Sequence, residues 1–306
     1  MLKINGVDVT DAVIEINVSQ QVNSGAASMS FSVLKSLSTD ILNGDTAELF
    51  HNGTSLFSGK VFYRSLSRDS AELTALDSLR GLKAVFPVVR KQQPVGEYIK
   101  TLAAMAAPEV RIGEMENIQT VVSEKQFEKL SLIELIYRAL DEVGEDNGRY
   151  ILRDEKGCLC LKNERNLKTN LVLDGANVLE FKYENAAGDS CNYIKLISNS
   201  AENALSAAAV ASDPDSIARY GRCCYIAELD EKNPEQLMLS AKKLLEQNSG
   251  EKQKLWITAI GDVRAAAGNI VFVDIDAVGR FWARITAAEH IFEGKSYTVR
   301  LQLEQL

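Results

Sequence analysis

The sequence is poor in the residues on which many chemical sites depend. Its 306 residues include only two histidines and five cysteines, and no Gly-rich phosphate-binding loop is present. The cysteine count is odd, and the spacing matches neither a disulfide framework nor a zinc site. We therefore expect no metal, no cofactor, and cysteines that stay as thiols in a reducing compartment. The cysteines are Cys158, Cys160, Cys191, Cys223 and Cys224.

Basic segments and long apolar segments are missing as well. The net charge is -8, and acidic and basic residues alternate along the whole chain instead of forming blocks. Binding to nucleic acid or to an anionic membrane by charge attraction needs a basic patch. No stretch reaches the roughly 18 apolar residues of a spanning helix, and the N-terminus lacks the pattern of a signal peptide. We expect no sequence-specific nucleic-acid partner, no membrane insertion and synthesis in the cytoplasm without export.

Alternating apolar and polar residues predict an antiparallel β domain over residues 1–86. Asn52-Gly53 lies between two alternating segments and suits the positive φ angles of a tight hairpin turn. Alternation returns over residues 172–306, interrupted by an Ala-rich segment, 201–212, which we interpret as a surface excursion of unknown role. A long helix is predicted at 233–250, because Asn233 can cap it, Pro234 suits its first turn and Gly250 can end it.

Residues 87–171 have a different period and predict a small α+β domain. One helix is expected between Pro94 and Pro108. A second opens at Ser131, where Glu134 completes a capping box, and ends near Gly144. A hairpin turned at Lys156-Gly157 follows. The fold class is therefore mainly β with an α+β insert.

The two β domains align without gaps at one constant shift along the sequence. This shift aligns Lys60 with Arg284. It also aligns the final strands of the two domains, with Leu73 on Tyr297 and Ala75 on Val299. Identities are few, and alternating strands can share a register by chance. The favoured interpretation is a duplicated β-barrel, whose matching positions are Gly44 and Gly268, Phe57 and Phe281, and Val61 and Ile285.

The C-terminal segment carries the most distinctive pattern. A helix rich in Leu and Lys precedes LWITAIGD, then a Gly before NIVFVD, then GRFWARITAAEHIFEGKSYTVRLQL. This pattern resembles the late control D or baseplate hub proteins of phages, especially the hub subunits of defective Gram-positive prophages and R-type tailocins. That family has a Gly where Gly268 stands, a small residue before Phe281 and a His where His290 stands. The similarity is greatest over residues 233–306, extends to the lead into the helix at 220–234, and elsewhere concerns layout more than residues.

The resemblance implies a structural protein of a contractile tail and not an enzyme. Hub proteins of this type carry two tail-tube-like antiparallel β-barrels per chain and form homotrimers, so three chains present six barrels. Such a ring matches a hexameric tail tube on one side and a trimeric spike on the other. The implied partners are other copies of the chain, the tail tube protein, the spike protein, and other baseplate and tape-measure proteins. The implied place is the tail baseplate of a virion or tailocin assembled in the bacterial cytoplasm.

Chemical alternatives depend on few residues. Nucleophilic catalysis needs a His near a Ser or Cys, but His51 lies in a predicted turn and His290 on a predicted strand, where packing is the favoured interpretation. Asp274 and Asp276 share a strand face and could hold a metal or act as an acid pair, although a solvated strand end fits them better. Four thiolates from the Cys158 and Cys223 pairs are conceivable, but neither pair has the spacing of a zinc knuckle.

Two functions of different class follow. The first is a structural baseplate hub subunit. The alternative is a tail-associated cell-wall hydrolase that uses carboxylates such as Asp274 and Asp276, although the chain ends on a barrel strand and leaves no length for a fused hydrolase domain. A substrate-binding β module of a secretion needle would share the barrel.

Overall fold

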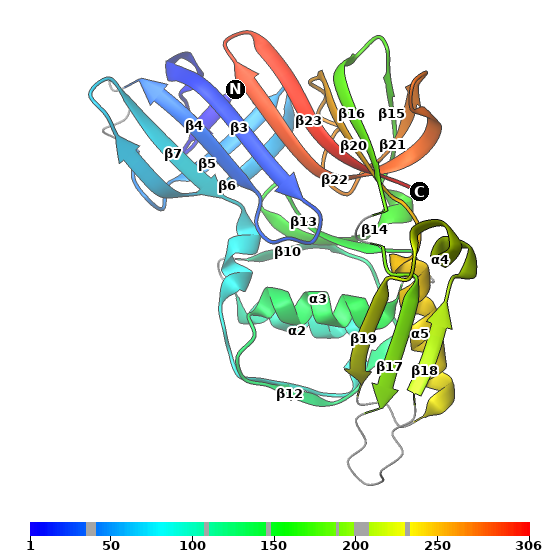
Figure 1. Cartoon of the computed structure of the whole chain (residues 1–306). Helices are drawn as coiled ribbons and strands as arrows, with labels where there is room; N and C mark the ends of the chain where they lie inside the picture. The colour runs from blue at the N-terminus through cyan, green and yellow to red at the C-terminus, as the bar shows by residue number, and fades with distance from the viewer. Residues whose placement is uncertain (35–40, 107–109, 145–147, 188–189, 199–207, 230–232) are drawn as a thin grey trace. The chain divides into compact units, whose positions relative to one another are not determined.

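The computed structural model describes residues 1–306 except 35–40, 107–109, 145–147, 188–189, 199–207 and 230–232. The chain forms two compact units (Figure 1). Unit 1 comprises Met1–Lys182 together with Leu255–Leu306, and unit 2 comprises Tyr183–Lys254. The helices in the described residues are too short and too polar to span a membrane.

The first half of unit 1 is an antiparallel sheet with the strand order β3-β4-β7-β6-β5-β1-β2. Asn52 and Gly53 have φ angles of 49° and 80° and connect β5 to β6, which confirms the predicted hairpin. Alternate side chains of these strands form one apolar core. The elements are β1 (Leu2–Ile4), β2 (Val7–Asp8), the 3-10 helix η1 (Thr10–Ala12), β3 (Val13–Gln21), β4 (Ser28–Leu34), β5 (Thr46–His51), β6 (Thr54–Leu66) and β7 (Ser70–Leu76).

A second half of unit 1 has a similar order, β16-β20-β23-β22, with β21 paired to β22 and β15 paired to β21. Among the pairings that the structure describes for this half, only β15–β21 is parallel. This half has its own apolar core. Its strands are β15 (Lys168–Asp174), β16 (Val178–Ala186), β20 (Lys252–Ile260), β21 (Ile270–Ile275), β22 (Gly279–Glu293) and β23 (Ser296–Gln305).

The two halves belong to one sheet of 13 strands, because β22 also pairs with β3. The mainly β class is therefore confirmed. The strands in the described residues do not close either half into a barrel, so the predicted pair of tail-tube-like antiparallel β-barrels is not confirmed within one chain.

The elements between the two halves form an α+β region of unit 1, in which α2 and α3 lie side by side (Figure 1). The predicted capping box is confirmed: Ser131 accepts from the Glu134 N–H, and Glu134 accepts from the Ser131 N–H. Gly144 ends α3 with φ 74°, and the hairpin turn at Lys156-Gly157 is also confirmed. The predicted stop at Pro108 lies outside the described residues.

The helices of this region are α2 (Val95–Met105), α3 (Leu132–Val143) and the 3-10 helices η2 (Ser78–Lys83) and η3 (Glu164–Asn166). Its strands are β8 (Val88–Arg90), β9 (Gln93–Pro94), β10 (Arg111–Met115), β11 (Val121–Val122), β12 (Lys125–Phe127), β13 (Tyr150–Glu155) and β14 (Cys158–Asn163). These elements enclose the largest apolar core among the described residues.

Unit 2 is a three-stranded sheet in the order β18-β17-β19, with α5 against it. Asn233 caps α5 and Pro234 is its first residue, as predicted. The interpretation of the Ala-rich segment as a surface excursion is wrong for residues 208–212, which form β18 and bury Ala209 and Ala211, while 201–207 lie outside the described residues. The elements are β17 (Tyr193–Ser198), β18 (Ala208–Ser212), α4 (Pro214–Tyr220), β19 (Cys224–Leu229) and α5 (Pro234–Asn248).

Candidate assembly edges

The strand pair β3–β22, which we call the seam, joins the two halves of unit 1. Seven residue pairs form it, from Ala287 opposite Gln21 to Glu293 opposite Glu15. The first part of β22 pairs instead with β21, and the change of partner follows a bulge at Thr286. The same edge of β22 thus pairs first with β21 and then, after the bulge, with β3. A strand of the first half is therefore hydrogen-bonded to a strand of the second.

Aromatic side chains pack beside the seam around Tyr297. The ring of Phe292 stacks on that of Tyr297 with centroids 4.2 Å apart, and the ring of His51 lies 4.7 Å from it. His290 is fully buried and its Nδ1 lies 2.9 Å from the Tyr297 hydroxyl. Gly261 faces the same ring so closely that a Cβ would lie 2.2 Å from a ring atom. The two histidines of the sequence therefore meet at one packed aromatic cluster.

Burial lowers the pKa of His290 to about 4, while the charge of Asp262 opposes this shift. His290 is therefore neutral near pH 7. Its Nε2 has no hydrogen-bond partner in the described part of the chain, and its Nδ1 contacts a tyrosine hydroxyl instead of a serine or cysteine. This environment is typical of a packed structural histidine.

Corresponding backbone contacts occur in the two halves at the shift that the sequence predicts. The N–H of Gly44 donates to the carbonyl of Val61 at 2.8 Å, and that of Gly268 donates to Ile285 at 2.8 Å. Both glycines have positive φ angles, 98° and 90°. The predicted aromatic positions correspond as well, because Phe57 pairs with Leu49 and Phe281 pairs with Val273.

The bulges that follow these contacts also correspond, at Phe62 in β6 and Thr286 in β22. Beyond the bulge the predicted alignment, which placed Leu73 on Tyr297, is wrong. Arg64 pairs with Leu73, and its counterpart Ala288 pairs with Leu301, so Leu301 is the structural equivalent of Leu73. The second hairpin is longer than the first, and an ungapped alignment cannot represent this difference.

Each strand of the seam, β3 and β22, has a counterpart in the other half of unit 1. Each counterpart pairs with a neighbouring strand on one side only. As β3 pairs with β4, so β16 pairs with β20, and in the described residues β16 has no other partner strand. In the seam, the part of β22 after Thr286 pairs with β3. Its counterpart in the first half is the part of β6 after Phe62, and among the described strands this part pairs only with β7. These two strand segments, Val178–Lys182 of β16 and Tyr63–Leu66 of β6, are called the open edges.

Large apolar side chains are exposed on both open edges. Tyr63 and Leu66 of β6 are 56% and 55% exposed, and Leu179 and Phe181 of β16 are 60% and 39% exposed. An unpaired strand edge with apolar side chains is a ready template for pairing with another chain. The open edges are therefore the candidate functional site.

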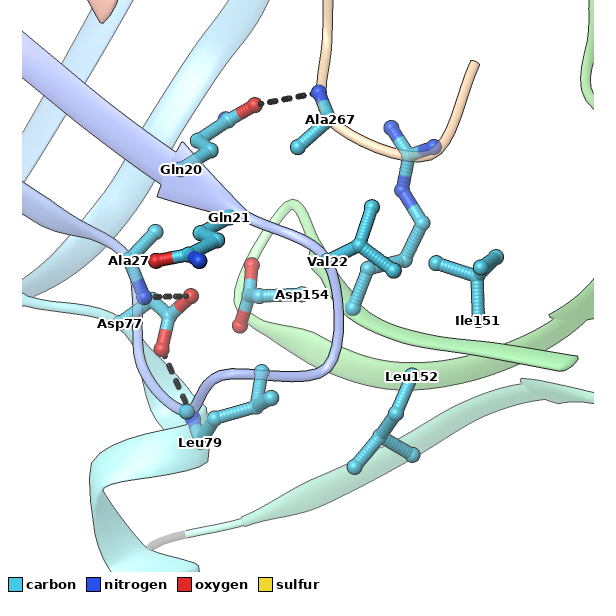
Figure 2. Close-up of a pocket in the computed structure, with 12 residues that line it drawn as sticks. Gln20, Gln21, Val22, Ala27, Asp77, Leu79, Ile151, Leu152, Asp154 and Ala267 are labelled. Carbon is cyan, nitrogen blue, oxygen red and sulfur yellow. Dashed lines mark hydrogen bonds between the residues drawn. The ribbon is translucent and has the colours of Figure 1, made fainter. Parts of the chain in front are cut away.

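A small cavity lies where the first half meets the α+β region (Figure 2). Asp77 caps η2 there, and its carboxylate accepts from the N–H groups of Leu79 and Ala27, each at 3.0 Å. Asp154 reaches the same cavity from β13 and accepts from the Gly157 N–H at 2.8 Å. Burial, and next the charge of Asp154, raise the pKa of Asp77 to about 8. The charge of the Asp77 carboxyl in this cavity therefore changes near pH 8.

A buried arginine joins the same region to the second half. Arg284, the predicted counterpart of Lys60, is 5% exposed and contacts Glu164 of η3 and Glu304 of β23. Its Nε lies 2.7 Å from Glu164, so the charge is compensated where it is buried. No sequence signal distinguished this position from an ordinary exposed Arg.

The other chemical candidates are four cysteines and the two aspartates at the end of β21. Asp274 forms a cross-strand ion pair with Arg280 at 2.8 Å, and Asp276 is exposed in the turn after β21. Cys158 and Cys160 lie on β14 in unit 1, whereas Cys223 and Cys224 lie in unit 2. Across the described residues, no group of three or more His, Cys, Asp or Glu side chains could hold a metal. The hydrolase alternative thus gains no assembled site.

A family model described as YQBQ-like matches residues 16–304. The chain belongs to the YQBQ-like family. No curated protein matches its sequence.

Solved structures with the same fold come from phage tails and from a related secretion system. The 43 kDa tail protein of prophage MuSo2 from Shewanella oneidensis has a TM-score of 0.77 at 12% identity, over 99% of this chain and 97% of that one. A tail protein from Neisseria meningitidis has a TM-score of 0.77 at 17% identity, over 99% and 95%. A component of the E. coli type VI secretion system, described as similar to T4 tail proteins gp27 and gp5, has a TM-score of 0.63 at 11% identity, over 100% and 77%. The predicted resemblance to phage tail proteins is confirmed at the level of the fold.

Proposed function

We propose that this YQBQ-like protein is a structural subunit of the baseplate hub of a contractile phage tail or R-type tailocin, whose copies associate through the open edges. The observation that carries the proposal is the seam. Within one chain, a β22-type edge already binds a β3-type strand. The equivalent edge on β6 and the equivalent strand β16 are both exposed, so a second copy can repeat the same pairing.

Such a contact is heterologous, because the edge on β6 of one copy receives β16 of the next. Heterologous contacts form closed rings when each step rotates by a suitable fraction of a turn. With two repeats per chain, three copies supply six repeats, and the ring has threefold and approximate sixfold symmetry together. This homotrimer would match a hexameric tail tube on one face and a trimeric spike on the other.

In this proposal residues 1–86 and 172–306 supply the two tube-like repeats, residues 87–171 form the domain between them, and unit 2 is an insertion in the second repeat. The six matching positions, such as Gly44 and Gly268, set the shape of each repeat. The edges that remain open in one chain become paired in the ring, which would complete the barrel-like wall. Its partners are further copies, the tube protein, the spike protein and neighbouring baseplate and tape-measure proteins, and it acts within the particle without catalysing a reaction.

Mass photometry of the purified chain tests the proposal. We expect a trimer whose fraction rises with concentration. Lysine on both open edges, in Tyr63→Lys with Phe181→Lys, should give monomers because charged side chains, and lysine above all, oppose the pairing of an exposed strand edge with another strand.

The matched control is Val89→Lys, which changes a side chain that is 61% exposed on β8, away from both open edges. This variant should assemble as the unchanged chain does. A chain that stays monomeric at every concentration would contradict self-assembly. Trimers that survive the double lysine variant would instead show that copies associate through another surface.

A further inference from the structure

Two cysteines of unit 2 lie close together in space although they are far apart in the sequence. Cys191 lies two residues before the start of β17, and Cys223 lies directly before β19. Their Sγ atoms are 4.0 Å apart. Since β17 and β19 are parallel neighbours, both sulfurs lie at the same end of the sheet.

The backbone around this pair is fixed by Asn192. Its side chain is 1% exposed, and its Nδ2 donates to the Gly221 carbonyl at 2.8 Å while its Oδ1 accepts from the Cys223 N–H at 2.8 Å. The N–H groups of Asn192 and Tyr193 both donate to the Cys223 carbonyl at 3.1 Å. Three of these four hydrogen bonds hold the Cys223 backbone against the two residues that follow Cys191, and the Cys191 N–H donates to the Asn248 carbonyl at 2.9 Å.

The distance between the two sulfurs is short enough for a bond to form after a small movement. A disulfide has an S–S length of about 2.05 Å, so the sulfurs need to approach by about 2 Å. Cys223 is exposed, so its thiolate can attack a small disulfide. Cys191 is half-buried beside the unit 2 core. Cys224 is exposed too, but successive residues at a strand point to opposite faces, so its side chain is directed away from this pair.

We propose that Cys191 and Cys223 are a thiol–disulfide pair, reduced inside the cell that makes the protein and oxidised once the particle is released. None of the five cysteines, all within described residues, forms a disulfide in the structure, which corresponds to the reduced state. The oxidant is a small-molecule disulfide such as oxidised glutathione, which reacts with thiolates by exchange.

The chemistry proceeds by two thiol–disulfide exchanges. The Cys223 thiolate attacks one sulfur of oxidised glutathione, which forms a mixed disulfide and releases one glutathione thiolate. The Cys191 thiolate then attacks the Cys223 sulfur and releases the second glutathione. The two cysteines lose two protons and two electrons, and one oxidised glutathione becomes two reduced glutathiones. The product joins the starts of β17 and β19 and encloses β17, β18 and α4 in a covalent loop.

The loop restricts the unfolded state of unit 2, so opening of this unit becomes rarer. For a loop closed between residues 191 and 223 the population of the open form should fall roughly five hundredfold. Proteolysis within unit 2 under native conditions, which samples the open form, should slow by a similar factor, and reduction with dithiothreitol should restore the original rate.

The experiment treats the full chain with oxidised glutathione and follows it by intact mass and peptide mapping. We expect the unchanged chain and Cys224→Ser to lose two hydrogens and to yield a peptide that links Cys191 to Cys223. Cys191→Ser should instead keep glutathione on Cys223, because the second exchange has no thiol. A link that involves Cys224, a stable glutathione adduct on the unchanged chain, or an unchanged proteolysis rate after oxidation would each overturn the proposal.

Discussion

His290 makes the stability of unit 1 depend on pH, and the size of the effect follows from its burial. The side chain has no exposed surface, and burial lowers its pKa from 6.5 to about 4. Between these pH values the unfolded chain binds a proton that the folded chain excludes. The free energy of unfolding therefore falls as the pH drops through this window, and it is unaffected by His290 above it.

The two pKa values set the magnitude. Each unit of difference is worth about 1.4 kcal/mol, so the loss approaches about 3 kcal/mol below pH 4. Between pH 7.5 and pH 4.5 the same values give a loss of about 2 to 3 kcal/mol. That is a large part of the stability of a typical domain.

Urea unfolding followed by tryptophan fluorescence measures this loss in the right part of the molecule. The only two tryptophans, Trp256 and Trp282, lie on β20 and β22, so the signal reports unit 1. His290→Gln has no imidazole to protonate and should lose about 2 to 3 kcal/mol less than the unchanged chain between pH 7.5 and 4.5.

Tyr297→Phe is the matched control for this comparison. It removes the hydroxyl that His290 Nδ1 contacts but keeps the ring that covers the histidine. Because burial is the first cause of the shifted pKa, this variant should keep the pH response of the unchanged chain. An equal loss of stability in His290→Gln and in the unchanged chain would refute the reasoning.

Two further predictions use the same fluorescence assay. The pKa of Asp77 is raised, so its folded form holds a proton that the unfolded chain releases, and stability should fall as the pH rises from about 4 to about 8. Asp154→Asn removes the neighbouring charge and should reduce the loss between pH 6 and pH 9; an undiminished loss would contradict the coupling. Gly261→Ala should lower the free energy of unfolding by about 3 kcal/mol, because its Cβ would meet the Tyr297 ring. The control Gly175→Ala, whose Cβ would have no atom within 4 Å, should change that free energy little. Equal losses in the two variants would argue against the contact with Tyr297.

Local signals in the sequence predicted the local structure well. The Ser131 and Glu134 capping box, the Asn52-Gly53 turn and the start of α5 each depend on a few neighbouring residues, and all are found. The family resemblance also led to the right fold class, mainly β, although the two barrels that it implied are not confirmed. These features need no knowledge of which distant strands meet.

Features that depend on distant pairing could not be predicted. The seam joins β3, near the start of the chain, to β22, near its end, and nothing in either strand specifies the other. The separate sheet of unit 2 was missed because Ala209 and Ala211 are small residues with a weak strand signal, although they are buried. Burial of His290, Arg284 and Asp77 likewise depends on tertiary packing, so their shifted or compensated charges are visible only in the structure.

Unit 2 is inserted at a point where the chain leaves and re-enters one sheet on adjacent strands. The chain departs along β16 and returns along β20, and these strands are hydrogen-bonded neighbours. The cost of closing a connection between two fixed points grows only slowly with its length. The sheet therefore places little constraint on what occupies residues 183–254, and a module of different size or chemistry could be exchanged there. This position is a natural attachment point for engineered cargo on an otherwise unchanged scaffold.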